Sequence, residues 1–128
     1  TGVKEITAAT LESIAFQTRD LIEASVIDGA DIKELRVDGG MVANDWFIKQ
    51  LSSLLGMKIL KPKFLETTAL GAAYLAGISS SLVDDFNHLQ NTLLVDKEIS
   101  PVETENALLD IKYRNWLKAV EAIKTIKD

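Results

Sequence analysis

The sequence contains no cysteine and a single histidine, and both shortages limit the chemistry that the chain can carry out. Without cysteine there are no disulfides and no thiolate metal ligands. No stretch approaches the roughly 18 uninterrupted apolar residues of a membrane-spanning helix. The first residues lack the basic stretch and apolar core of a signal peptide. We therefore expect a cytoplasmic protein without a membrane segment.

Positive charge is also in short supply, with 14 lysine and arginine residues against 19 aspartate and glutamate residues and a net charge of -5. This balance has the wrong sign for a surface that neutralises the phosphates of a nucleic acid, so we expect no nucleic-acid partner. A small anion held by backbone amides is compatible with it. The single histidine, His88, lies in a polar stretch without metal-ligand spacing, and we expect it to be exposed. The sequence therefore predicts no metal site.

Hydrophobic periodicity divides the chain into alternating helices and strands. Strand, helix, strand, helix is the order that produces parallel strands covered by helices, so we expect a single α/β domain over residues 1–128 with a mostly parallel sheet. The predicted elements are a helix from Ile6 to about Val26, a strand over ELRV (34–37), a helix from Asn44 to about Leu55, a strand over MKILKP (57–62), a helix over LETTALGAAYLAG (65–77) and a final helix from Glu103 to Lys127.

Three of the predicted helices carry an apolar stripe that we expect to face the core. Both tryptophans, Trp46 and Trp116, lie on such stripes, and packing is the role that we expect of them. The stripes consist of Ile6, Ala9, Ile14, Leu21 and Ile22 in the first helix, of Trp46, Phe47, Leu51, Leu54 and Leu55 in the second, and of Leu108, Ile111, Trp116, Leu117, Val120, Ile123 and Ile126 in the last.

Small residues dominate the predicted helix over residues 65–77. Glycine inside a helix costs about 1 kcal/mol relative to alanine, so Gly71 predicts that a neighbouring helix comes close to that face. Just before this helix, Lys61 and Lys63 flank Pro62. Both lysines are able to face a phosphate, although we expect them in a solvated loop. On the solvated surface we expect Asp84, Asp85 and the acidic residues of the tail.

Two adjacent glycines in LRVDGGMVANDWF (35–47), Gly39 and Gly40, separate a predicted strand from a predicted helix. Glycine permits positive φ and removes the Cβ that would keep a ligand away from the backbone. The helix that follows offers unpaired N–H groups and partial positive charge, which suit a phosphate or the polar edge of a nucleoside. Asn44, in its first turn, carries both a donor and acceptors. A tight turn capped by Asn44 explains the same residues without a ligand, so spacing alone leaves both interpretations open.

The segment LRVDGGMVANDWFIKQLSSLLGMKILKPKFLETTALGAAYLAG (35–77) resembles the C-terminal domain of the FGGY carbohydrate kinases, within the actin, Hsp70 and hexokinase superfamily. The glycerol kinase branch is resembled more closely than the pentulose kinases, and this rests on the combination of VDGG, Asn44 four residues beyond Gly40, and ETTALGAA. AATLESIAFQTRDLIEA and KYRNWLKAV resemble the flanking helices of that domain. The resemblance implies a ribonuclease H-like nucleotide-binding domain, the C-terminal half of a kinase.

The resemblance also implies residue roles. Gly40 and Asn44 would contact ATP or ADP, with Gly39 as a weaker neighbour, and the full-length form would transfer the γ-phosphoryl group of Mg-ATP to glycerol. The family's catalytic aspartate and polyol-binding residues belong to the N-terminal part of the polypeptide. We therefore expect no catalytic residue in this chain and no activity of the chain alone. Mg²⁺ would be held mainly by the nucleotide and the N-terminal domain, which is the expected partner. For Asp38, beside the glycines, we expect a structural role at the strand end.

Two alternatives stay open at this point. The chain could belong to another FGGY sugar kinase, which only the substrate pocket of the N-terminal domain would distinguish. It could also be a catalytically inactive interaction module with the same fold. Such a module would pair through the face that the N-terminal domain would cover, for example as a homo-oligomer.

Overall fold

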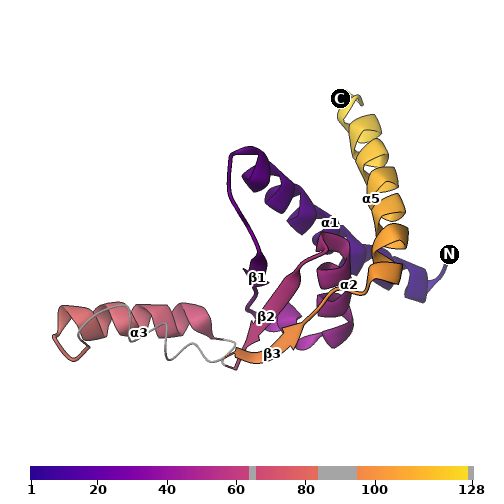
Figure 1. The fold of residues 1–128 in the computed structure, drawn as a ribbon. Helices are drawn as coiled ribbons and strands as arrows, with labels where there is room; N and C mark the ends of the chain where they lie inside the picture. The colour runs from indigo at the N-terminus through magenta and orange to yellow at the C-terminus, as the bar shows by residue number, and fades with distance from the viewer. Residues whose placement is uncertain (64–65, 84–94, 127–128) are drawn as a thin grey trace.

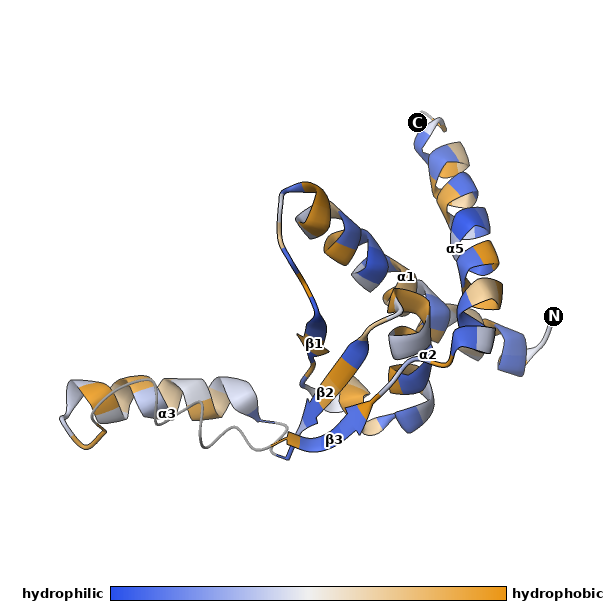
Figure 2. Cartoon of the chain, in the orientation of Figure 1, coloured by the Kyte–Doolittle hydropathy of each residue, from blue (hydrophilic) through white to orange (hydrophobic). Residues whose placement is uncertain are grey.

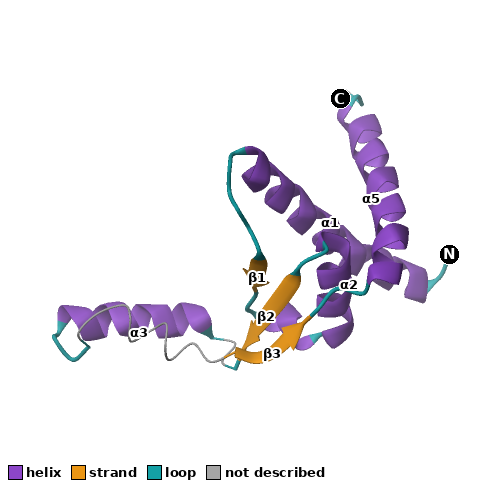
Figure 3. Ribbon diagram, viewed as in Figure 1, coloured by secondary structure: helices purple, strands orange, loops and turns teal. Residues whose placement is uncertain are grey.

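The computed structural model describes residues 1–63, 66–83 and 95–126. Helices and strands alternate along most of the chain, and three helices gather beside a small sheet (Figures 1 and 3). In chain order, the described elements are α1 (Val3–Ile27), β1 (Glu34–Arg36), the short 3₁₀ helix η1 (Gly40–Ala43), α2 (Asp45–Leu55), β2 (Lys58–Pro62), α3 (Thr67–Ser79), β3 (Val95–Ile99) and α5 (Glu103–Lys124).

Local signals fix both ends of α2, the helix that follows the double glycine. The side chain of Asn44 accepts a hydrogen bond from the backbone N–H of Phe47 at 3.2 Å and so caps the N-terminus. At the other end, Gly56 adopts a left-handed φ of 63°, and its N–H bonds to the carbonyl oxygen of Ser52. The predicted helix is therefore confirmed to within one residue at its start.

Strands β1 and β2 are parallel, with Leu35 beside Ile59, which confirms the α/β interpretation. Strand β3 pairs antiparallel with the other edge of β2, with Ile99 beside Ile59. Among the described residues the sheet is thus mixed rather than mostly parallel. The sequence does not predict β3, because three successive charged residues, at positions 96–98, hide the alternation that marks a strand.

The core lies between one face of the sheet and helices α1, α2 and α5 (Figure 1). Leu35, Ile59 and Ile99 are neighbours across the three strands and share this face. Ile59 and Ile48 are almost completely buried, and each such side chain stabilises the fold by about 2 kcal/mol. The other buried members are Ala15, Phe16, Val42, Phe47, Leu51, Leu54, Leu109 and Tyr113.

The buried face of α5 differs from the predicted one, although the helix itself is confirmed. Leu109, Tyr113 and Trp116, spaced i, i+4 and i+7, pack inward. The predicted Leu108 and Ile111 are instead 60% and 58% exposed. Aromatic contacts decide the orientation, because the rings of Tyr113 and Trp116 lie with their centroids 5.9 and 5.8 Å from that of Phe16 in α1.

The predicted apolar faces of the first two long helices are also partly wrong. Trp46 is 44% exposed, and Ile48, two positions later, occupies the core instead. In α1 the predicted Ile6 and Leu21 are exposed, while Ala15 and Phe16 between them are buried. The middle of α1 therefore makes its core contacts, and both ends of this 25-residue helix extend beyond them (Figure 1).

Helix α3 extends away from the sheet and from the other helices, and it is largely apolar or neutral along its length (Figures 1 and 2). A Cβ at Gly71 would meet no atom within 4 Å among the described residues, so the close neighbouring helix predicted there is absent from that part of the chain. Close packing occurs at Gly77 instead, where a Cβ would lie 2.9 Å from Cγ2 of Val83. The chain folds back after α3, and this close approach explains why glycine occupies position 77.

Three residues discussed from the sequence, Asp84, Asp85 and His88, lie outside the described residues. Within the described ranges, no helix has the length and apolar character needed to cross a membrane.

Candidate functional site

The backbone turns sharply directly after β1. Val37 extends the parallel ladder by donating its N–H to the carbonyl oxygen of Leu60 at 3.2 Å. Gly39 then adopts a φ of 89°, a conformation that residues with a Cβ rarely adopt, and its carbonyl oxygen accepts from the N–H of Val42. This turn leads through η1 to Asn44. The three predicted site residues therefore share one loop at the carboxyl end of β1.

Asn44 uses only one end of its side-chain amide within the described part of the protein. Its Oδ1 accepts the capping bond from Phe47, while no described residue accepts a hydrogen bond from its Nδ2. The two N–H bonds of Nδ2 remain available to an acceptor on a ligand, such as a hydroxyl or a ring nitrogen. The cap and a ligand contact are therefore compatible, so the two interpretations of Asn44 do not exclude each other.

Neither backbone conformation nor packing against the described residues requires Gly40 to be a glycine. Its φ lies outside the left-handed region, and a Cβ there would meet no atom within 4 Å. Gly39 differs, since its positive φ requires glycine although the space beside it is also open. An absent Cβ beside open space allows another molecule to approach the backbone closely.

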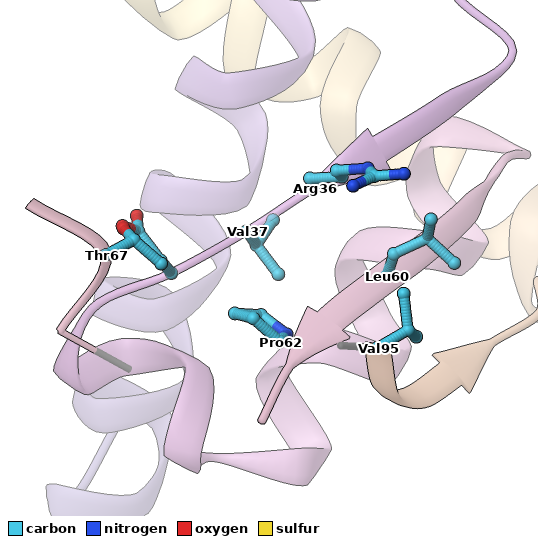
Figure 4. Close-up of a pocket in the computed structure, with 7 residues that line it drawn as sticks. Arg36, Val37, Leu60, Pro62, Thr67 and Val95 are labelled. Carbon is cyan, nitrogen blue, oxygen red and sulfur yellow. The ribbon is translucent and has the colours of Figure 1, made fainter. Parts of the chain in front are cut away.

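An apolar cavity of about 300 Å³ lies beside this loop (Figure 4). Arg36 and Leu60, which are neighbours in register, alternate along their strands with the core residues Leu35 and Ile59 and so point away from the core. The cavity is lined by Arg36, Val37, Asp38, Leu60, Pro62, Thr67 and Val95. It adjoins the glycine loop through Asp38, but none of the three predicted site residues lines it.

Asp45, the first residue of α2, connects the loop to the sheet. Its Oδ2 accepts a hydrogen bond from Nζ of Lys97 in β3 at 2.7 Å, and its Oδ1 lies 3.7 Å from Nζ of Lys61 in β2. The hydrogen bond from Lys97 and then its positive charge hold the pKa of Asp45 below its usual range. Lys61 therefore belongs to a strand and contacts Asp45, which corrects the expectation of a solvated loop. Asp45 and Lys97 are 52 positions apart, so no local motif identifies them.

The described residues contain no cluster of metal-ligating side chains. No group of three or more histidine, aspartate or glutamate side chains within the described ranges is placed to hold a metal ion. Asp45, next to Asn44, is already paired with lysine. A Mg²⁺ ion that accompanied a nucleotide here would depend on the phosphates and on ligands from elsewhere.

Comparison with known proteins identifies the family. Residues 1–80 match the model described as the FGGY family of carbohydrate kinases, C-terminal domain. The chain belongs to the FGGY family of carbohydrate kinases. The matched residues include α1, the two parallel strands, the glycine loop and α3. The resemblance seen in the sequence is therefore confirmed at the level of the family.

A curated relative named glycerol kinase, from Alkaliphilus metalliredigens, is 44% identical over 118 residues. The alignment covers 91% of this chain and 23% of the relative. The chain thus spans about a quarter of the length of the curated relatives that it matches.

Solved structures agree with this assignment. A glycerol kinase from Plasmodium falciparum, solved with ADP, superimposes with a TM-score of 0.70 at 31% identity, over 94% of this chain and 24% of that one. A ligand-bound xylulose kinase from Lactobacillus acidophilus has a TM-score of 0.82 over 94% of this chain and 25% of that one. At 19% identity this second likeness shows the fold alone. The predicted α/β fold of the actin and hexokinase type is confirmed.

Proposed function

We propose that this chain is the nucleotide-binding C-terminal domain of a glycerol kinase. The complete enzyme transfers the γ-phosphoryl group of ATP to a terminal hydroxyl of glycerol and produces glycerol 3-phosphate. A relative of that name at 44% identity and a similar glycerol kinase solved with ADP support the proposal. The observation that carries it furthest is the side chain of Asn44, whose oxygen caps α2 while its Nδ2 group is left without an acceptor among the described residues.

The nucleotide site consists of Gly39, Gly40 and Asn44. The two glycines let the nucleotide approach the backbone, because no Cβ stands between them and the open space beside the loop. Asn44 donates from Nδ2 to an acceptor on the nucleoside. The N-terminus of α2 adds partial positive charge, which favours a ligand that carries phosphates.

Phosphoryl transfer depends on positioning and on stabilisation of charge, and this chain contributes the positioning of the nucleotide. The residues that would hold Mg²⁺ belong to the N-terminal part of the kinase, and the ion would help to neutralise the charge of the phosphates. That part also supplies the base that accepts the proton of the glycerol hydroxyl. The chain alone is therefore inactive as a kinase, and the complete enzyme works in the cytoplasm.

The partner of this domain is the N-terminal part of the kinase, which makes up about three quarters of the aligned relative. Helix α3 supports this proposal because it extends from the sheet (Figure 2). Leu75 in this helix and Leu82 just beyond it are exposed. Covering these side chains would remove apolar surface from water. Residues 1–128 then act as one structural unit of the larger enzyme.

Nucleotide binding is tested by titrating the ¹⁵N-labelled 128-residue chain with ADP. We expect saturable shifts at Gly39, Gly40 and Asn44. Asn44→Asp is the decisive variant, because it keeps the capping oxygen and removes the Nδ2 donor. It should retain the wild-type melting temperature and lose binding, whereas Asn44→Ala should lose both the cap and binding. A chain that melts cooperatively but shows no shifts up to millimolar ADP contradicts the proposal.

The substrate is tested in a fusion that places this chain behind the first three quarters of the Alkaliphilus metalliredigens glycerol kinase. We expect glycerol-dependent release of ADP, with a higher KM for ATP in the Asn44→Asp fusion and an unchanged KM for glycerol. The matched control is the intact Alkaliphilus enzyme. A fusion that folds and is active while Asn44→Asp leaves the KM for ATP unchanged would exclude the role of Asn44.

A further inference from the structure

We infer that Asp45 is a positioning residue for the proposed nucleotide site, holding the N-terminus of α2, and with it Asn44, against the ends of β2 and β3 through Lys61 and Lys97. The inference rests on the proposed function for the identity of the ligand. Its geometry rests on the ion pairs alone. It assigns a task to three charged residues that lie outside the glycine loop and that do not contact the ligand themselves.

The two lysines face each other across the sheet. In the antiparallel register of β2 and β3, Lys61 is the direct partner of Lys97. Like charges directly opposite on neighbouring strands destabilise the pairing. The side chain of Lys61 is only 16% exposed, so water screens the repulsion less than it would between fully solvated groups. Negative charge at this point therefore favours the pairing of the two strands.

Asp45 supplies that charge. One carboxylate oxygen contacts each lysine, at 2.7 Å for Lys97 and 3.7 Å for Lys61. Among the described residues, no other acidic side chain forms an ion pair with either lysine. The carboxylate is also well placed with respect to its own helix, because negative charge in the first turn interacts favourably with the helix dipole.

The position of Asp45 in the chain explains why this clamp acts on the ligand site. Asp45 follows Asn44 directly, and Asn44 makes the cap that begins α2. If the carboxylate is neutralised, the two lysines repel each other and the positive end of the α2 dipole beneath the first turn of the helix. The turn then moves relative to β2, and the Nδ2 group of Asn44 moves with it.

An ordinary surface ion pair would have no such consequence, since many exposed pairs contribute nothing measurable. The two cases differ in how the variants combine. A positioning clamp predicts that removing one lysine repairs the damage caused by removing the carboxylate, because the repulsion disappears. An independent surface pair predicts no repair. Glu98, which pairs with Lys58 across the same two strands at 2.9 Å but away from the loop, offers a matched control.

The experiment measures the Kd for ADP and the melting temperature of the 128-residue chain and of five variants: Asp45→Asn, Asp45→Glu, Lys97→Met, Asp45→Asn with Lys97→Met, and Glu98→Gln. We expect Asp45→Asn to weaken binding about fivefold, near the upper limit for exposed pairs. Asp45→Glu and Glu98→Gln should bind within about twofold of wild type, and the double variant should regain most of the lost affinity. The ¹⁵N shift of the Phe47 amide, which reports the cap, should change in Asp45→Asn and return in the double variant.

Two results would overturn the inference. One is an Asp45→Asn chain that binds ADP as wild type does while Asn44→Asp loses binding. The other is a double variant that binds ADP no more tightly than Asp45→Asn. The ion pairs of Asp45 would then contribute to general stability and not to the positioning of Asn44. Failure of the proposed function looks different, because wild type would then not bind ADP at all. The Phe47 amide shift would still show, without any nucleotide, whether Asp45 positions the start of α2.

Discussion

Tyr113 of α5 donates a hydrogen bond from its phenol to Asp20 of α1, 93 positions earlier in the chain. The same hydroxyl lies 3.2 Å from Oε2 of Glu23, and the guanidinium of Arg19 lies 4.1 Å from the centroid of the tyrosine ring. Arg19 also bonds to Asp110 of α5 at 2.9 Å. Burial, and then the hydrogen bond to Asp20, raise the pKa of Tyr113, so the phenol stays a donor at all ordinary pH values. The last helix is thus attached to the first by polar groups as well as by rings.

The first prediction concerns this attachment. Tyr113→Phe keeps the ring contacts with Phe16 and Trp116 and removes only the hydroxyl, which leaves Asp20 without its donor. We expect a loss of about 1 kcal/mol in the free energy of unfolding, or about 4 °C in melting temperature. The loss should be smaller in an Asp20→Asn background, because the side chain at position 20 then carries no charge that the missing hydroxyl would leave partly buried and unpaired. Equal losses in both backgrounds would show that the hydroxyl and Asp20 are not coupled.

The second prediction separates the two glycines of the loop. Gly39→Ala should cost about 2 kcal/mol of stability, because its φ of 89° is strained for any residue with a Cβ. Gly40→Ala should leave the melting temperature within about 1 °C of wild type, since its new Cβ meets no described atom. The same variant should weaken ADP binding. A Gly40→Ala chain with wild-type stability and wild-type binding would remove Gly40 from the site.

Most of the fold is predictable from local signals, and the exceptions have a common cause. The Asn44 cap, the Gly56 stop and the run ending at Pro62 each act within a few residues, so α2 and β2 are predicted almost to the residue. Strand β3 exists because β2 offers it an edge, which depends on residues far away in the sequence. The inward face of α5 likewise depends on the ring of Phe16, which α1 supplies. These features depend on contacts with residues that are distant in the sequence, and a local sequence pattern does not include those residues.

The candidate site divides in the same way. The glycine loop is a short continuous motif, and the structure gathers Gly39, Gly40 and Asn44 in one turn as the sequence suggests. The contact of Asp45 with Lys97 and Lys61 joins three elements, so the spacing of these residues along the chain does not predict it. Residues that form a short continuous motif are therefore easier to predict than residues that contact the motif from distant elements.

The third prediction concerns the two glycines of α3. Gly71→Ala should stabilise the chain by up to about 1 kcal/mol, because a helix favours alanine and the new Cβ meets no described atom. Gly77→Ala should destabilise it by about 1 kcal/mol, because the new Cβ would lie 2.9 Å from Cγ2 of Val83, a β-branched side chain that cannot easily turn away. Urea denaturation of both variants measures the difference. In the complete kinase, a loss of stability in Gly71→Ala would reveal a close neighbour supplied by the N-terminal part.

The last prediction concerns pH and the contact between Asp110 and Arg19. The hydrogen bond from Arg19, and then the positive charge of Arg114, hold the pKa of Asp110 below its usual range. A carboxyl group whose pKa is lowered by folding stabilises the fold above its unfolded pKa of about 3.9, and this contribution disappears as the pH falls through the folded value. Asp110→Asn should therefore melt below wild type at pH 7.

The gap between Asp110→Asn and wild type should narrow steadily as the pH falls below about 4, since both chains then have a neutral side chain at this position. Melting temperatures recorded from pH 7 to pH 3 measure it. Asp31→Asn is the matched control, because the one described residue that pairs with Asp31 is an exposed Lys33 in the loop after α1. That variant should follow wild type at every pH. A gap for Asp110→Asn that stayed constant down to pH 3 would mean that packing, rather than charge, is what the variant removes.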